Sequence, residues 1–156
     1  MLYCAGYTVS FQEVPDEVSL VLLIADCPHS CKGCHSPNLR KPEGFDLENC
    51  INDILDEYGD AITCVCFMGE GRDPPALLRC NNLAKKRGYK TAIYSGFTNA
   101  WQIYMPYFDY YKCGPYIEAK GGLDNPNTNQ FMLRLKVVDG DWTFDDITYR
   151  FQRSND

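Results

Sequence analysis

The sequence has few of the features that mark membrane, exported or nucleic-acid-binding proteins. Its longest apolar run, Val18 to Ala25, is interrupted by Ser19 and is far shorter than the roughly 20 residues that cross a bilayer. No basic region followed by an apolar stretch and a cleavage site stands near the first residue, so we expect no export signal and a cytoplasmic location. Positive charge is scarce, with 15 Lys and Arg against 21 Asp and Glu, a net charge of −6. Because such a surface repels phosphate backbones, we expect neither nucleic acid nor membrane as a partner.

Internal repeats, low-complexity segments and linkers rich in Gly, Ser or Pro are also missing. The 156 residues are 45% hydrophobic and 23% charged, which is typical of one globular domain, here 1–156. A complete eight-fold (β/α) barrel needs about 250 residues, so a closed barrel of that kind is excluded.

The apolar pattern predicts strands that alternate with helices. The predicted strands are Tyr7–Phe11, Ser19–Ala25, Ala61–Phe67, Lys90–Tyr94, Phe108–Lys112, Phe131–Val138 and Ile147–Phe151. One predicted helix follows the N-cap Asp46 and ends at Gly59, and a second follows Asp73 and ends at Gly88. This alternation predicts an α/β fold, a single domain in an open partial (β/α) barrel of about five to six mostly parallel strands. Asp139-Gly140 predicts a C-terminal β-hairpin.

Two loops stand out from the rest of the chain. The segment from Asp26 to Gly44 is a long loop rich in Cys, Pro, Gly and Lys, and loops of that length are usually functional. The turn from Met68 to Gly71 is the second. Both follow predicted strands, and ligands of open α/β sheets bind beyond the carboxyl ends of the strands. We therefore expect the two loops to converge on one side of the sheet.

Cysteine is abundant, with nine residues in a chain for which we expect no export signal. Reduced thiols are therefore expected rather than a disulfide framework. Cys50 and Cys80 lie on the apolar faces of the predicted helices, which indicates core positions. Cys64 and Cys66 are two apart on a predicted strand and so point to the same face. Buried thiols are the expectation for this pair, and ligands of a second cluster are the alternative.

Three cysteines form a C-x3-C-x2-C cluster directly after the predicted buried strand: Cys27, Cys31 and Cys34. Thiolates so close in sequence can hold one soft metal centre. Three of them leave one iron of a four-iron cluster open to a ligand from outside the protein. A tetrahedral structural zinc is the alternative, for which His29 or His35 would supply the fourth ligand.

With this cluster, the chain resembles the radical S-adenosylmethionine (SAM) enzymes, and in detail the small activating enzymes of anaerobic ribonucleoside-triphosphate reductase. The segments that carry the resemblance are Cys27–Pro37, Val65–Gly71, Tyr94–Phe97, Phe108–Glu118 and Gly122–Gln130. Gly33 stands where the wider superfamily favours an aromatic residue. The small reductase activases are similar to this chain in having glycine at that position. Met68 replaces the first Gly of the superfamily's Gly-Gly-Glu turn.

The resemblance implies a [4Fe-4S] cluster on the three cysteines and SAM as the second cofactor. One electron, from a donor of the flavodoxin or ferredoxin type, would cleave SAM, and the resulting radical would take a hydrogen atom from a glycine of the reductase. The cofactors carry such chemistry, while the protein binds and orients them. The residues expected to contact SAM are Gly33, Cys34, His35, Gly69, Glu70, Gly71 and Ser95. The Gly69–Gly71 turn would receive the methionine ammonium, with the negative charge supplied by Glu70 or by backbone carbonyls.

Other functions stay open at this point. The substrate of the same chemistry could be another glycyl-radical enzyme or a small molecule, or the chain could be a zinc-binding interaction module without catalysis. About 120 residues follow the cluster, which leaves little room for a lid over a small substrate and favours a macromolecule. A group of aromatic residues is expected in the core, with docking of the reductase as its alternative role. The group consists of Trp101, Tyr104, Tyr107, Phe108, Tyr110 and Tyr111.

Overall fold

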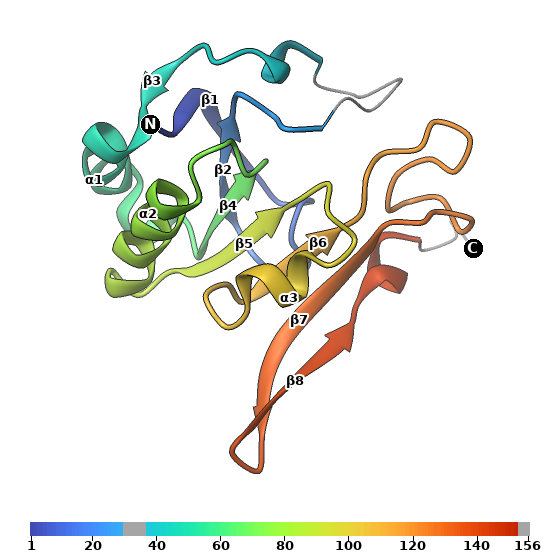
Figure 1. Cartoon of the computed structure of the whole chain (residues 1–156). Helices are drawn as coiled ribbons and strands as arrows, with labels where there is room; N and C mark the ends of the chain where they lie inside the picture. Colours follow the sequence, from blue (N-terminus) through green and yellow to red (C-terminus); the bar gives the residue numbers. More distant parts are fainter. Residues whose placement is uncertain (30–36, 153–156) are drawn as a thin grey trace.

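An eight-stranded mixed sheet forms the centre of the computed structural model, which describes residues 1–29 and 37–152 (Figure 1). Along the chain the strands are β1 (Tyr3–Ser10), β2 (Ser19–Ile24), β3 (Phe45–Asp46), β4 (Cys64–Met68), β5 (Lys90–Tyr94), β6 (Tyr110–Cys113), β7 (Phe131–Val138) and β8 (Asp141–Asp146). The helices are α1 (Leu47–Tyr58), α2 (Pro74–Lys86) and α3 (Ala100–Tyr104), and the short 3₁₀ segments are η1 (Pro37–Arg40), η2 (Gly59–Ala61) and η3 (Thr148–Phe151). The order across the sheet is β3-β1-β2-β4-β5-β6-β7-β8.

The centre of the sheet is parallel and its two sides are antiparallel. Strands β2, β4, β5 and β6 pair in parallel, as the predicted crossover units require. The pairs β1–β2, β1–β3, β6–β7 and β7–β8 are antiparallel. The expectation of five to six mostly parallel strands was therefore wrong, because the described residues form eight strands and four of the seven pairings among them are antiparallel. The connections β1–β2 and β7–β8 are too short for a crossover, so these strands turn back on their neighbours.

The C-terminal hairpin is present, but its second strand was misplaced. Asp139 and Gly140 both have positive φ angles, 53° and 84°, which is the backbone of a tight hairpin turn. Strand β8 therefore starts at once, at Asp141, and the predicted strand Ile147–Phe151 is mostly the 3₁₀ segment η3. The prediction failed because β8 is rich in aspartate and partly exposed, so it lacks the apolar pattern of a strand.

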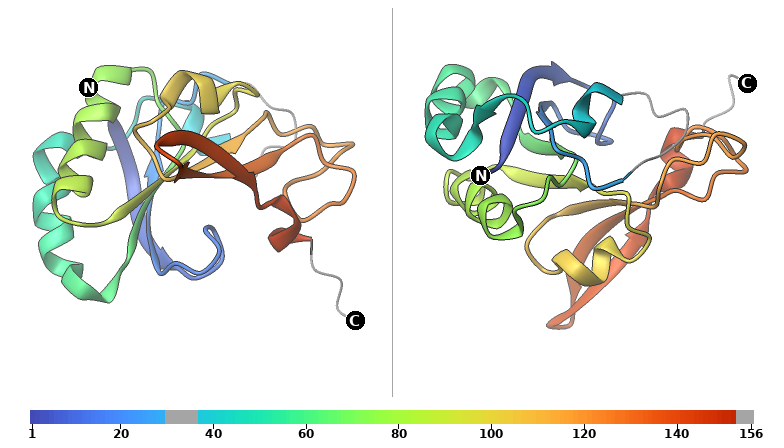
Figure 2. Two further views of the ribbon diagram at one scale, coloured as in Figure 1. Left: turned by 90° about the horizontal axis from the view of Figure 1, so that it is seen from below. Right: turned by 45° about the horizontal axis from the view of Figure 1, so that its top comes forward.

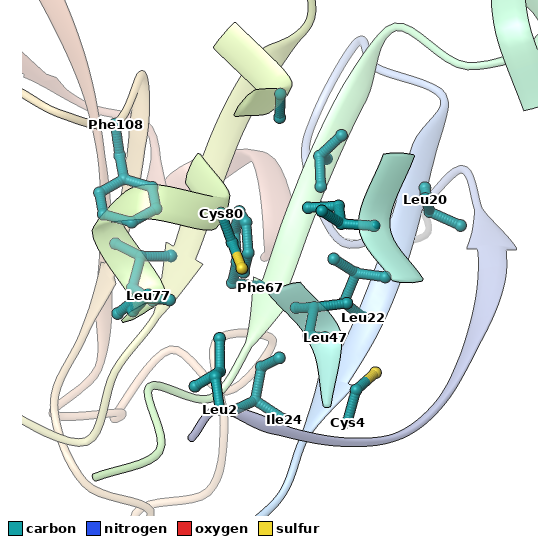
Figure 3. Packing of buried hydrophobic residues seen from close by; sticks show 14 of the residues in the cluster. Leu2, Cys4, Leu20, Leu22, Ile24, Leu47, Phe67, Leu77, Cys80 and Phe108 are labelled. Atoms are coloured by element: carbon teal, nitrogen blue, oxygen red, sulfur yellow. The ribbon is translucent and has the colours of Figure 1, made fainter. Parts of the chain in front are cut away.

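Helices α1 and α2 lie together on one face of the sheet, as the views in Figures 1 and 2 show. Alternate residues of the central strands, such as Leu22 and Phe67, point toward these helices. There they meet Leu47 of α1 and Leu77 of α2 in a fully buried apolar cluster (Figure 3). This packing fixes the directions of β2, β4 and β5, and with them the ends of the strands from which the long loops leave.

The opposite face of the sheet is covered by the β1–β2 loop (residues 11–18) and by segments near the C-terminal end of the described chain. Val14 of this loop is buried with Cys66 and with Ile147 in a second apolar cluster. Arg150 of η3 makes a two-pronged ion pair with Asp16 at 2.7 and 2.9 Å. The β1–β2 loop therefore contacts the C-terminal segments of the described chain. The loop and these segments cover this face of the sheet, whereas helices α1 and α2 cover the other face.

Helix α2 begins at Asp73, whose carboxylate accepts a hydrogen bond from the Met1 ammonium at 2.6 Å and one from the Ala76 amide at 3.2 Å. These two contacts, in that order of strength, lower the pKa of Asp73. A carboxyl group with a lowered folded-state pKa stabilises the fold above its unfolded pKa, and this contribution is lost as the pH falls through the folded value. Asp73→Ala is therefore expected to lower the free energy of unfolding by about 1 kcal/mol at pH 7, with a smaller difference below about pH 4.

Urea titrations at pH 7 and pH 3 measure this loss. Asp73→Asn is the matched control, because asparagine is an equally good N-cap, and most of the stability should remain. Equal stability of the Ala variant and the parent protein at pH 7 would contradict the capping role.

No helix within residues 1–29 and 37–152 is both long enough and apolar enough to cross a lipid bilayer.

Candidate functional site

A cavity of about 760 Å³ opens at the carboxyl ends of the parallel strands. This volume is in the range of small-molecule and cofactor sites. Its wall is built from the segments that follow each strand of the parallel centre: Cys27 and His29 after β2, Gly69 and Glu70 after β4, Ser95 and Gly96 after β5, and Lys112 of β6. The β1–β2 loop and η3 contribute Asp16, Arg150 and Phe151, and η1 and the β6–β7 connection also line the cavity.

The expected convergence of the two loops is observed. His29 of the cysteine-rich loop lies 3.3 Å from Glu70 of the turn after β4, measured from Nε2 to Oε2. Of the residues expected to contact SAM, Gly69, Glu70 and Ser95 line the cavity. Gly71 packs behind the turn against Leu2 rather than among the lining residues. The remaining expected positions, Gly33, Cys34 and His35, together with Cys31, lie outside the described residues.

The turn after β4 requires its glycines for local reasons. Gly69 has a φ of +109° and Gly71 a φ of +64°, conformations that other residues rarely adopt. A Cβ at Gly69 would lie 3.1 Å from the carbonyl oxygen of Ile24, and one at Gly71 would lie 2.8 Å from Leu2 Cδ1. The turn is therefore pressed against the end of β2, which brings Glu70 next to the start of the cysteine-rich loop.

Glu70 is a buried carboxylate whose two oxygens both accept hydrogen bonds, and only 4% of the residue is exposed. Oε1 accepts from the Tyr104 hydroxyl at 2.8 Å. Oε2 accepts from the Ser95 hydroxyl and from the Gly96 amide at 3.3 Å, and it faces His29. Burial, together with the Glu70 charge, raises the pKa of Tyr104, so its hydroxyl stays protonated and donates.

The His29 ring fits into a space that only glycine leaves open. It makes an edge contact with Phe97, with ring centroids 4.7 Å apart. On the other side it lies over Gly96, where a Cβ would be 2.5 Å from His29 Cδ2. The backbone amide of His29 donates to Cys27 Sγ at 3.4 Å. The sequence indicated His29 as a candidate fourth ligand of a zinc site, whereas the structure gives it defined partners.

The first turn of the cysteine-rich loop is also held at its base. Asp26 has a φ of +60°, unusual for a residue other than glycine, and accepts from Arg72 Nε at 3.1 Å. The amide of Cys27 donates to the Leu39 carbonyl at 2.9 Å, and Arg72 reaches the Cys27 carbonyl at 3.5 Å. Cys27 is half-buried at the cavity wall. Its position is thus fixed by groups that cysteine spacing alone does not identify.

Within the described part of the chain, no three His, Cys, Asp or Glu side chains are grouped so that they could hold a metal ion. Cys31 and Cys34, two of the three cysteines expected to bind the cluster, lie outside the described residues. Cys27 is therefore the expected ligand that the structure describes.

Cys64 and Cys66 are both fully buried on the same face of β4, as predicted. Burial raises the pKa of Cys64 to about 12 and that of Cys66 well above its usual value. Because the thiolate is the reactive form, both thiols are expected to react at least tenfold more slowly with iodoacetamide at pH 8 than half-buried Cys50. Mass spectrometry of the folded, metal-free protein measures the rates, and the unfolded protein is the control. Labelling of Cys66 as fast as Cys50 would contradict this burial.

The aromatic group belongs mainly to the core, which was the expectation. Phe108 makes edge contacts with Phe67, Tyr104 and Tyr111. Tyr107, in contrast, is 52% exposed. Helix α3, and with it the role of Tyr104, was not predicted, since a helix of only five residues gives little periodic signal.

Lys112 also lines the cavity, and it was not among the site residues expected from the sequence. Its ammonium donates to the carbonyls of Gly114 at 2.9 Å and Ser95 at 3.3 Å. With the Asp16–Arg150 pair and Glu70, it gives the cavity wall groups of both charge signs.

No protein-family model, curated protein or solved structure matches this chain at a significant level. The motifs and the geometry of the cavity are therefore the basis for any functional conclusion.

Proposed function

We propose that this chain is a radical SAM activating enzyme that forms the glycyl radical of anaerobic ribonucleoside-triphosphate reductase. One observation carries the proposal: three separate segments of the resemblance meet at one cavity. These segments are 27–29, 69–71 and 94–97, and they contact one another through His29, Glu70 and Gly96. The meeting point lies at the carboxyl ends of parallel strands, where open α/β sheets bind their ligands.

The chemistry of the donor set and the size of the cavity fit the two cofactors. Cys27 presents a thiol at the wall, and thiolates are the ligands of iron–sulfur clusters. Together with Cys31 and Cys34 it would hold a [4Fe-4S] cluster with one iron open. When bound, the cluster supplies the electron that cleaves SAM. The cavity volume of about 760 Å³ suits a ligand the size of SAM.

The protein's own residues would bind and orient the ligand. The wall carries groups of both signs, including Lys112 and the Asp16–Arg150 pair, which suits a ligand with an ammonium and a carboxylate. The Gly69 turn lets main chain approach closely. The partial barrel expected from the alternation of strands and helices also belongs to this proposal, with the β1–β2 loop and η3 lining the cavity on the side that the strands leave open.

A macromolecular substrate is favoured by the small number of elements around the cavity. Segments 11–16, 122–124 and 150–151 form its rim beyond the sheet. Besides these segments, Leu39, Arg40 and Tyr116, the described residues offer little to enclose a small substrate, so a glycine loop of the reductase would complete the site. Another glycyl-radical enzyme or a small molecule as substrate is an outcome of the tests below, as is a zinc module without catalysis.

Anaerobic reconstitution with iron and sulfide tests the proposal. We expect about four irons per chain, a brown protein, and 5′-deoxyadenosine from SAM once a reductant is added. Samples without reductant are the control. Tight binding of one zinc with no SAM cleavage would contradict the proposal and support the interaction module.

The substrate requires a second measurement. The reconstituted protein is incubated with SAM, reductant and the candidate reductase, and a glycyl radical is sought by electron paramagnetic resonance. We expect a radical signal on the reductase. Active SAM cleavage without that signal would contradict the reductase as substrate and point to another glycyl-radical enzyme or a small molecule.

A further inference from the structure

The contacts around Glu70 give this residue a role different from the one its motif implies. We infer that Glu70 and Tyr104 are positioning residues that hold His29, and through His29 the Cys27 end of the metal-binding loop. In this assignment the Glu70 carboxylate does not bind the ammonium of SAM. The part that concerns metal and SAM rests on the proposed function, whereas the contacts themselves do not.

The hydrogen-bond occupancy of Glu70 is the first reason. A carboxylate offers about four acceptor positions. Here the Tyr104 hydroxyl, the Ser95 hydroxyl, the Gly96 amide and the His29 ring surround the two oxygens. Three of these groups crowd Oε2 and the residue is only 4% exposed, so an ammonium that bound at Oε2 would have to displace an internal donor. Removing a partner from a buried charged group is strongly unfavourable, which makes such a displacement costly.

The second reason is that the segment after β5 contacts both His29 and Glu70. Ser95 and Gly96 donate to Glu70, Gly96 leaves room for the His29 ring, and Phe97 packs against that ring. We call these residues, with Glu70 and Tyr104, the His29 socket. The socket is therefore built by the segments that directly follow β4 and β5 and by α3, and it receives a side chain from the cysteine-rich loop.

The connection from the socket to Cys27 is the third reason. The amide of His29 donates to Cys27 Sγ, so a fixed His29 fixes the thiol two residues before it. The base of the loop is held separately by Arg72. Cys27 is thus oriented from both sides by the protein alone, and such preorganisation favours uptake of a metal centre. Tyr104 is not among the residues that line the cavity, so it acts only through Glu70.

A pair of tyrosine variants separates this role from general stability. Tyr104→Phe removes the hydroxyl that donates to Glu70, and Tyr110→Phe removes a comparable hydroxyl that donates to Glu17 at 3.1 Å on the other face of the sheet. In the metal-free protein, we expect amide hydrogen exchange of Cys27 and His29 to rise on the order of tenfold in Tyr104→Phe only. Unchanged exchange in Tyr104→Phe, or an equal rise in both variants, would overturn the positioning role.

Glu70→Gln distinguishes positioning from ligand binding. The amide replaces one acceptor by a donor, which then faces donors such as the Gly96 amide. For a positioning residue we expect faster exchange at Cys27 and His29 without metal, and a lower iron content after reconstitution. If Glu70 instead binds SAM, exchange and iron content stay unchanged while calorimetry of the reconstituted protein shows loss of SAM affinity, which would refute our assignment.

Failure of the proposed function has a different signature. If the parent protein takes up no cluster but the two tyrosine variants still differ in exchange, the His29 socket stands and the radical SAM function is wrong. If the parent protein cleaves SAM and the tyrosine variants exchange alike, the function stands and the socket assignment is wrong.

Discussion

Cys27→Ala is expected to reduce SAM cleavage to background and to lower the iron content after anaerobic reconstitution. The change removes one of three thiolates, and an iron without its protein ligand is readily lost from a cluster. Cys27 lies at the cavity wall beside His29 and Glu70, where no other described cysteine lines the cavity to replace it. Iron analysis and chromatography of 5′-deoxyadenosine measure both effects. Cys31→Ala and Cys34→Ala should give the same result.

Cys50→Ala and Cys80→Ala are the controls for the loss of a thiol. Cys50 is half-buried on α1 and Cys80 is fully buried on α2, and neither lines the cavity. SAM cleavage should stay largely intact in both. Cleavage by Cys27→Ala at the level of these controls would remove Cys27 from the site and with it the proposed mechanism.

Gly96→Ala is expected to destabilise the protein and to reduce SAM cleavage, because the added methyl group overlaps the His29 ring. The new Cβ would lie 2.5 Å from His29 Cδ2 and 2.7 Å from His29 Nε2, which is shorter than the non-bonded contacts that Cβ atoms make in proteins. The His29 ring must therefore leave its position, and Glu70 loses a partner. Overpacking of this kind lowers the free energy of unfolding by about 1–3 kcal/mol. We also expect at least a tenfold loss of SAM cleavage, because the Cys27 end of the loop is no longer held.

Gly6→Ala is the matched control for this substitution. Gly6 lies on β1, its backbone is not in the left-handed region, and a Cβ there meets nothing within 4 Å. Its stability and its SAM cleavage should match those of the parent protein. Urea unfolding and cleavage assays compare the two variants, and indistinguishable results for both would mean that the His29 ring is not confined by Gly96.

Local sequence signals predicted the central elements well. Asp46 and Gly59 bound helix α1, as expected from an N-cap and a glycine C-cap, and the apolar run from Ser19 became the buried strand β2. These signals work because they depend on residues within one turn or one strand. The order of motifs along the chain also placed Glu70 and Ser95 among the expected site residues, and both line the cavity.

The hydrogen-bond partners of these site residues could not be predicted from local sequence signals. Tyr104 is separated from Glu70 by 34 positions and His29 by 41, so the contacts exist only after the strands are packed side by side. The antiparallel pairing at the N-terminal side of the sheet and the position of the last hairpin strand were missed for a related reason. Strand β8 carries few apolar residues, and its existence depends on pairing with β7 rather than on its own composition.

The sequence by itself determined the α/β class, the positions of the two long helices α1 and α2, and the set of residues that carry the resemblance, because each of these is encoded in short patterns of polarity and residue type. Only the tertiary structure decided the mixed sheet, the cavity wall and the donors around Glu70. The physical reason is that hydrogen bonds to a buried carboxylate join side chains from different elements. Their geometry follows from packing against the sheet, which no local pattern records.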